Sequence, residues 1–200
     1  MPPLQLLENT SPTRDRSRDK ALLVAIEYKW PPFEGVLPLN TPHKDLERVR
    51  WHLMTHWGYH PQNITTLKDG PTDEVDENMV PTRANIFREI DNLVAGLKPG
   101  DRRVFFFAGH CYQIKNRSGT ETDGKDEVIL TAKHNGPPDE TLDYGFAHPV
   151  RQGLVIDNEL RDRLVNSIPC GAKLVAIADT CHSGTLFGKS SLPPSTPSIL

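Results

Sequence analysis

The sequence predicts an α/β protein in which helices cover both faces of a mainly parallel sheet. Short apolar runs of strand length recur along the chain, and segments with apolar residues at three- and four-residue spacing separate them. Apolar runs without polar alternation are typical of parallel strands that are buried on both faces. Strands that alternate with helices indicate βαβ crossovers and therefore a parallel sheet.

The first half of the chain contains two predicted strands and two predicted helices. KALLVAIE at 20–27 is the first buried strand, and a Pro-rich loop follows it. A helix over 43–57 comes next, because its apolar residues share one face, and Gly58 ends it. A short strand is expected at 64–67. Thr82 is the expected N-cap of the second helix, whose apolar stripe runs on to a Lys-Pro-Gly stop.

The second half continues the alternation. VFFFA at 104–108 and EVILT at 127–131 are predicted buried strands, and the polar, Pro- and Gly-rich segment at 132–153 is predicted to be a loop. Asp157 is expected to cap a short helix. KLVAIA at 173–178 is the last predicted strand. The alternation predicts one compact domain over 20–187, preceded by a flexible lead-in at 1–19 and followed by a disordered tail at 188–200.

Composition excludes several classes of protein. A net charge of -3 over 200 residues argues against a nucleic-acid-binding protein, which would carry a basic excess. No apolar run approaches the roughly 18 residues of a membrane-spanning helix. Three cysteines without a CxxC pair argue against a disulfide framework and a four-cysteine zinc site. The N-terminus lacks the order of charge and apolar residues of a secretory signal, so a cytoplasmic location is expected.

Two buried strands end in reactive residues. The run at 104–108 leads into Gly109-His110-Cys111, and the run at 173–178 leads into Asp179-Thr180-Cys181. Sites in open α/β sheets lie beyond the carboxyl ends of strands. If the two strands are parallel neighbours, His110 and Cys181 emerge at one edge as an imidazole base and a thiol nucleophile. Backbone N–H groups of Cys111 and Cys181 then face a developing oxyanion. The competing interpretation is that Cys181 is a small apolar residue at a strand end.

These motifs resemble those of the metacaspases, which are caspase-like cysteine peptidases. The family's usual turns read Ser-Gly-His-Gly and Asp-Ser-Cys-His-Ser-Gly, and this chain has AGHC and DTCHSG in the same order. The resemblance covers about 20–185. It implies a caspase-like three-layer α/β/α sandwich and a cysteine endopeptidase in which His110 is the base and Cys181 is the nucleophile.

The resemblance also implies a substrate preference. Asp45 and Asp179 match the acidic residues of the family's primary specificity pocket. Carboxylates near the nucleophile attract a substrate Arg or Lys and repel Asp or Glu, so the expected partners are proteins or peptides cut after basic residues. The alternative for Asp45 is a solvated carboxylate that stabilises the start of its helix.

The chain departs from the family pattern at several positions. Cys111 replaces the Gly after the catalytic His, and a left-handed backbone there would cost about 1–2 kcal/mol. Ala108 replaces the usual Ser, and Pro42 stands at the usual Cys. The chain ends nineteen residues after Cys181. We therefore expect the small segment that completes the family's sheet to be absent, and the resulting open edge to favour self-association.

The chemistry itself requires no cofactor, but the resemblance implies Ca²⁺ as an activator. Asp123, Asp126 and Asp157 match acidic segments of the family's calcium site, and hard oxygen ligands suit this ion. Gly188 stands where the family has a further Asp, and the alternative is a solvated acidic loop. An imperfect phosphate loop at 184–190 and a zinc site are not favoured by spacing.

Two hypotheses follow. The first is a Cys–His endopeptidase, and the second is a weakly active or inactive caspase-like domain that serves as an interaction or regulatory module. If the His110 ring and the Cys181 sulfur face one another across a cleft, the endopeptidase is favoured. If either side chain is buried away from that cleft, the interaction or regulatory module is favoured.

Overall fold

A computed structural model describes residues 16–116, 119, 123–139, 141, 145, 148–180 and 186–187. Within those residues, no helix is both long and apolar enough to cross a lipid bilayer. Cys181 and the rest of its turn, together with the predicted tail, lie outside the described residues.

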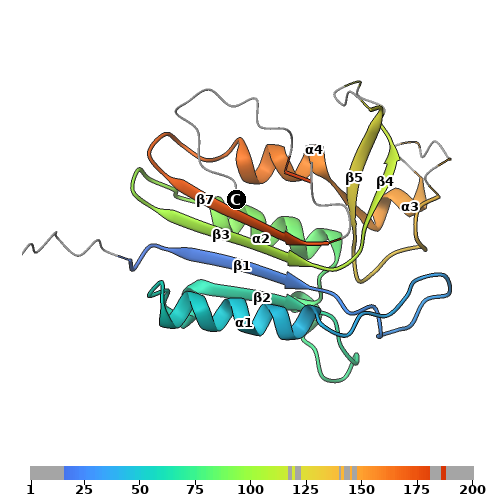
Figure 1. The fold of residues 1–200 in the computed structure, drawn as a ribbon, viewed down its shortest axis with the longest axis horizontal. Coiled ribbons are helices and arrows are strands. Elements are labelled where there is room, and N and C mark those ends of the chain that lie inside the picture. The colour runs from blue at the N-terminus through green and yellow to red at the C-terminus, as the bar shows by residue number, and fades with distance from the viewer. Residues whose placement is uncertain are drawn as a thin grey trace, which may run out of the picture.

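The centre of the molecule is a parallel sheet in the order β2-β1-β3-β7 (Figure 1). Its strands are β1 (Lys20–Ala25), β2 (Ile64–Lys68), β3 (Arg102–Ala108) and β7 (Lys173–Asp179). All three pairings are parallel. The expected parallel sheet is therefore confirmed, and the central strands β1 and β3 account for the longest apolar runs because both of their faces are covered.

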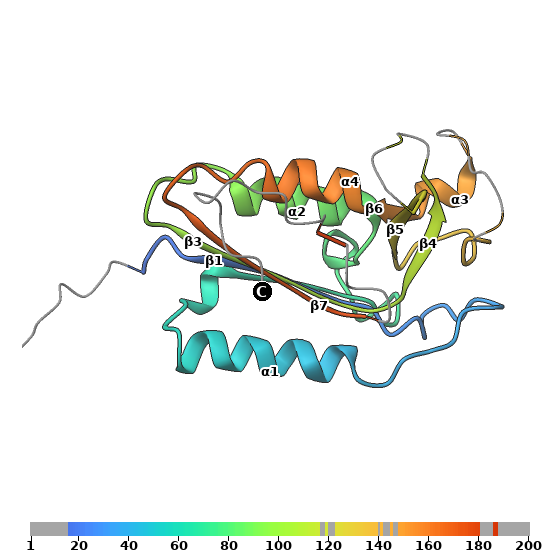
Figure 2. The same ribbon diagram turned by 45° about the horizontal axis from the view of Figure 1, so that its top comes forward.

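Helices cover the two faces of this sheet (Figure 2). Helix α1 (Pro42–Thr55) lies on one face, and α2 (Arg83–Val94) and α4 (Asp157–Leu160) lie on the other. Alternate residues of β1 divide between two apolar clusters: Leu22 and Val24 pack toward α2, whereas Ala21, Leu23 and Ala25 pack toward α1. The three-layer α/β/α sandwich is thereby confirmed.

Helix ends follow the sequence signals. The Thr82 hydroxyl accepts the N–H of Asn85 at 3.2 Å, as expected of an N-cap. Gly58, with φ of 68°, follows α1 and has the left-handed backbone that favours glycine. Shorter elements complete the chain: η1 (Pro61–Asn63), η2 (Glu77–Met79), α3 (Pro149–Gln152) and the π-helical turn η3 (Arg161–Val165) that continues α4.

The predicted strand at 127–131 is real but belongs to a different sheet. A separate antiparallel sheet has the order β4-β5-β6, built from β4 (Cys111–Lys115), β5 (Lys125–Leu130) and β6 (Leu154–Ile156). The prediction placed 127–131 in the parallel sheet and missed both neighbouring strands. An apolar run reports burial and not pairing direction, and β6 has three residues, too few for a periodic signal.

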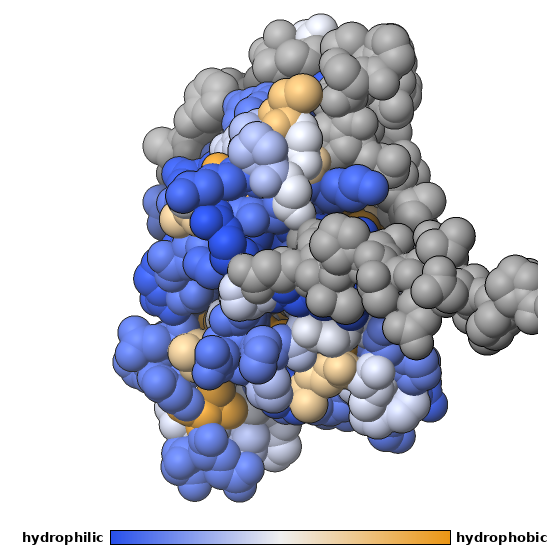
Figure 3. Space-filling model, turned by 90° about the vertical axis from the view of Figure 1, so that its left-hand side faces the viewer, coloured by the Kyte–Doolittle hydropathy of each residue, from blue (hydrophilic) through white to orange (hydrophobic). Residues whose placement is uncertain are grey.

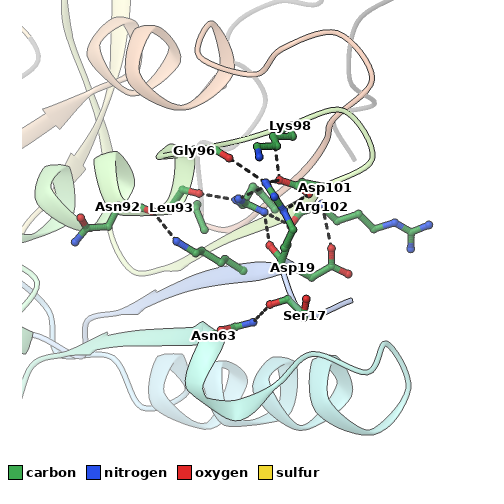
Figure 4. A network of polar contacts seen from close by, with 12 residues as sticks. Ser17, Asp19, Asn63, Asn92, Leu93, Gly96, Lys98, Asp101 and Arg102 are labelled. Carbon is green, nitrogen blue, oxygen red and sulfur yellow. Dashed lines mark hydrogen bonds and ion pairs between the residues drawn. The ribbon is translucent and has the colours of Figure 1, made fainter. Parts of the chain in front are cut away.

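The edge where the strands begin is held by a polar network that includes the end of the predicted lead-in (Figure 4). The Arg18 guanidinium donates to both carboxylate oxygens of Asp101, at 3.0 and 2.8 Å. Asp19 is buried and accepts the N–H of Arg102 at 3.1 Å. Buried Arg103 donates to the Leu93 carbonyl. Residues 16–19 are therefore fixed to the sheet, on a side that is mostly hydrophilic (Figure 3).

Candidate active site

The carboxyl ends of β3 and β7 lie side by side. Ala108, the last residue of β3, is the register partner of Asp179, the last residue of β7. His110 follows Ala108 by two residues, and Cys181 follows Asp179 by two residues. The parallel pairing thus directs both chain segments out of the same edge of the sheet. The position of the Cys181 side chain lies outside the described residues.

The loop between β1 and α1 fixes the imidazole of His110 through two contacts. Its Nε2 donates to the Leu37 carbonyl at 2.7 Å. Since a carbonyl oxygen only accepts, Nε2 carries the proton in the neutral ring, and Nδ1 is the nitrogen that accepts a proton. The ring also packs on Tyr28, with centroids 4.7 Å apart and planes inclined by 35°. The tautomer and orientation are those that a general base requires if its proton donor faces Nδ1.

The departures from the family pattern are accommodated by the backbone. Among the described residues, Tyr28 is the only non-glycine residue with a positive φ. Cys111 therefore does not adopt the left-handed conformation, and the expected cost does not arise. Cys111 instead begins β4 and its side chain is buried. Ala108 is buried in the cluster beneath α1. Both substitutions therefore fill packed positions without backbone strain.

The two predicted pocket residues lie at the same end of the sheet. Helix α1 begins where β1 and β3 end, which places Asp45 in its first turn near that edge (Figure 2). Asp45 accepts a hydrogen bond from Arg48 at 2.9 Å. Asp179 is exposed at the end of β7. The structure thus brings both acids to the edge that carries His110, and Asp45 already has a guanidinium partner.

Sequence reasoning missed a buried carboxylate at this edge. Asp69 follows β2 directly and is 3% exposed. It accepts the N–H groups of Glu27 and Tyr28, each at 2.8 Å, and a bond from His43 Nε2 at 2.8 Å. These bonds satisfy the buried charge and tie the loop after β1 to the start of α1. The signal in the sequence was an Asp directly after a strand, at the carboxyl edge where sites of open α/β sheets collect.

The predicted calcium ligands form an acidic cluster between β5 and α4. Asp126 and Asp157 are both buried. Burial, opposed by hydrogen bonds and reinforced by the charges of Asp126 and Glu127, raises the pKa of Asp157 to about 8. Burial likewise raises the pKa of Asp126. The Glu127 Oε2 atom is buried and has no hydrogen-bond partner. Burial therefore favours the protonated, uncharged form of the Asp126 and Asp157 carboxyl groups.

The acidic cluster meets only part of what a Ca²⁺ site requires. Asp126 and Asp157 supply two hard carboxylates, and Asp123 lies close enough to act on the Asp126 charge. Within the described residues, however, no group of three or more His, Cys, Asp or Glu side chains is arranged to hold a metal ion. The side chains of Asn116 and Asn158 donate to Asp126 and occupy its Oδ1 atom.

The fold has a known relative among solved structures. The crystal structure of protein GSU0716 from Geobacter sulfurreducens superposes with a TM-score of 0.56 over 84% of this chain and 52% of that one, at 24% sequence identity. A likeness at this level of identity shows a shared fold alone.

The sequence comparison establishes the family. Residues 19–189 match the model for the metacaspase, peptidase C14 domain, and the chain therefore belongs to the metacaspase family of cysteine peptidases. Metacaspase-1 of Yarrowia lipolytica is 36% identical over 168 residues, which are 84% of this chain and 32% of that protein. Metacaspase-1 of Scheffersomyces stipitis is 33% identical over 84% of this chain and 36% of that protein. Metacaspase-1A of Neurospora crassa is 32% identical over 85% of this chain and 33% of that protein. The chain spans about a third of the length of these relatives.

Proposed function

We propose that this chain carries the Cys–His dyad of an endopeptidase, with Cys181 as nucleophile and His110 as general base. The observation that carries the proposal is the register of β3 and β7. Ala108 and Asp179 are paired, and His110 and Cys181 each follow by two residues. Fixation of the His110 ring by the Leu37 carbonyl supports it further, because catalysis requires a base of defined tautomer.

The chemistry follows from this arrangement. Nδ1 of His110 accepts the thiol proton of Cys181, and the thiolate attacks the scissile carbonyl carbon to form a tetrahedral intermediate. The imidazolium then gives its proton to the leaving amine as the C–N bond breaks. His110 next removes a proton from water, which hydrolyses the thioester and regenerates the thiol.

The oxyanion of the intermediate requires N–H donors near the sulfur. The N–H groups of Cys111 and Cys181 are the proposed donors. Leu130 donates its N–H to the His110 carbonyl at 3.1 Å, which makes residues 110 and 130 a hydrogen-bonded pair of the antiparallel ladder. Hydrogen-bonded and non-hydrogen-bonded pairs alternate, so the N–H of Cys111 is directed away from β5. This direction supports a role for that N–H outside the ladder.

We further propose that the substrate residue before the cut is Arg or Lys. Asp45 and Asp179 are the residues that would bind it, because the first turn of α1 and the last residue of β7 both lie at the end of the sheet that leads to His110. A substrate guanidinium would have to displace the Arg48 guanidinium, which now pairs with Asp45 at 2.9 Å. Proteins and peptides with basic residues are the proposed substrates.

Calcium activation is a separate proposal that rests on Asp126 and Asp157. Burial, reinforced by neighbouring carboxylates, raises the pKa of both carboxyl groups, and a bound divalent cation would favour their ionised forms. The expected result is a rise in the melting temperature with added Ca²⁺ in the wild-type chain and a smaller rise in Asp157→Asn. An equal rise in both proteins would contradict the proposed ligand role of Asp157.

The dyad is tested with a fluorogenic peptide that ends in Arg and with a peptide inhibitor that bears an Arg beside a thiol-reactive group. Cys181→Ala should abolish both cleavage and labelling. Cys170→Ala is the matched control, because Cys170 is an exposed free thiol outside this edge, and it should leave both unchanged. Cleavage that persists in Cys181→Ala would overturn the assignment. A wild-type chain that neither cleaves nor takes the label would favour the interaction or regulatory module.

A further inference from the structure

Tyr28 is a buried residue in an unusual backbone conformation beside the His110 turn. It follows β1 by three residues, is 4% exposed, and has φ of 57°. A left-handed backbone at a non-glycine residue costs about 1–2 kcal/mol and persists only where the surroundings fix it. Here the buried carboxylate of Asp69 accepts the Tyr28 N–H at 2.8 Å. The fold therefore holds this side chain in place at the expense of local strain.

The Tyr28 hydroxyl interrupts the ladder between β4 and β5. In a hydrogen-bonded antiparallel pair, the two residues exchange two N–H···O bonds. His110 and Leu130 make one of these directly, from the Leu130 N–H to the His110 carbonyl at 3.1 Å. In place of the second, the His110 N–H donates to the Tyr28 hydroxyl at 2.9 Å, and that hydroxyl donates to the Leu130 carbonyl at 2.8 Å. The phenol is thus inserted between the two backbones.

Two further observations show that the turn is built around this hydroxyl. A Cβ atom at Gly109 would lie 2.9 Å from the Tyr28 hydroxyl oxygen and 2.8 Å from the Phe107 ring, so the glycine is required for close approach and not for a positive φ. Burial raises the pKa of Tyr28 well above its usual value of 10.0, so the phenol stays protonated and can donate to Leu130. The same ring packs on the His110 imidazole at 4.7 Å.

We propose that Tyr28 is a positioning residue for the His110 base: its hydroxyl separates the backbone of residue 110 from Leu130, and its ring supports the imidazole. This inference rests on the proposed function of His110. Without the hydroxyl, the His110 N–H can bond directly to the Leu130 carbonyl at about 2.9 Å, in place of two consecutive bonds. Residue 110 would then move by about 1 Å or more, and a misplacement of about 1 Å can cost about 10²-fold in rate.

Tyr28→Phe tests the inference, because it removes the hydroxyl and keeps the ring. The expected result is a fall in kcat of about 10–100-fold with KM within about twofold, since positioning of the base affects the chemical step. Tyr112→Phe is the matched control. Its ring lies 6.0 Å from His110 on β4, and its substitution should leave kcat within about twofold.

A second readout does not depend on activity. In protein labelled with ¹⁵N-histidine, the His110 amide and imidazole signals should shift in Tyr28→Phe and stay in place in Tyr112→Phe. If Tyr28→Phe does not fold, Gly109→Ala is used in its place, because the added methyl group would displace the Tyr28 hydroxyl. The His110 imidazole signals and kcat of Gly109→Ala are then compared with those of the wild type.

The outcomes separate the two proposals. Unchanged His110 signals in folded Tyr28→Phe, or an unchanged kcat in an active enzyme, would overturn the positioning role and leave the dyad intact. Shifted His110 signals in Tyr28→Phe, together with no peptidase activity in the wild-type chain, would support the positioning of residue 110 and count against the proposed function.

Discussion

Asp157→Asn should stabilise the protein at neutral pH, and the gain should grow as the pH rises. Asp157 is 2% exposed and lies beside the charges of Asp126 and Glu127. Its pKa is raised from 3.8 to about 8 in the folded protein. Between these two pH values the folded state binds more protons than the unfolded state, so this group lowers the free energy of unfolding as the pH rises from 4 to 8.

The size of the effect follows from the two pKa values. One unit is worth about 1.4 kcal/mol, so the cost at pH 7 has an upper bound of about 4 kcal/mol. Asn keeps a side-chain oxygen that can accept the Asn158 N–H, now bonded at 2.7 Å, and carries no charge. Between pH 5 and pH 8 its advantage over the wild type should grow by up to about 3 kcal/mol.

Urea unfolding at several pH values between 5 and 8, with EDTA present, measures this difference. Asp162→Asn is the control, because this acid is exposed on the following turn and should change the free energy of unfolding by less than about 0.5 kcal/mol at every pH. Parallel stability curves for the wild type and Asp157→Asn would refute the reasoning, because they would mean that Asp157 is ionised without cost in the folded protein.

Three other predictions concern the dyad, the specificity pocket and the start of the sheet. His110→Ala should lower kcat by about 10²–10⁴-fold on the Arg-ended peptide, and a smaller loss would count against a general base at this position. Asp45→Asn and Asp179→Asn should each reduce the preference for Arg and Lys, measured with a peptide library, and a library cut mainly after Asp would contradict the pocket. Arg18→Ala should lower the free energy of unfolding by about 1–2 kcal/mol, because a two-bond ion pair to a buried carboxylate is lost; an unchanged urea midpoint would show that the segment before β1 adds no stability.

The sequence determined the parallel core because that signal is local. β1 and β3 read as continuous apolar runs, and such runs arise where both faces of a strand are covered. α1 and α2 show three- and four-residue spacing, and the N-cap at Thr82 was readable from one residue type. His110 and Cys181 could be selected because they follow strand ends and chemistry in α/β sheets collects at carboxyl edges, whereas Asp179 was selected through the family resemblance.

The antiparallel sheet could not be read in the same way. β5 is as apolar as the parallel strands, and nothing in its composition specifies the direction of its partners. It pairs with β4, a strand that ends at Lys115 and has a weak apolar pattern, and with β6, which begins only at Leu154 and has three residues. The same limit applies to the calcium prediction: the sequence selected Asp126 and Asp157, whereas their mutual burial and raised pKa values depend on the packing of α4 against β5.

Tyr28 and Asp69 mark what only the tertiary structure decided. In the sequence Tyr28 is a polar-ended aromatic residue after a strand, and nothing near it indicates a partner 82 or 102 residues away. Its role arises because β1 and β3 are neighbours in the sheet, which brings the loop after β1 against the turn after β3. Local sequence specifies which residues are apolar, capped or reactive. The chain order does not specify that the Tyr28 hydroxyl lies between His110 and Leu130, or that Asp69 binds the loop after β1. Both depend on contacts between elements that are far apart in the sequence.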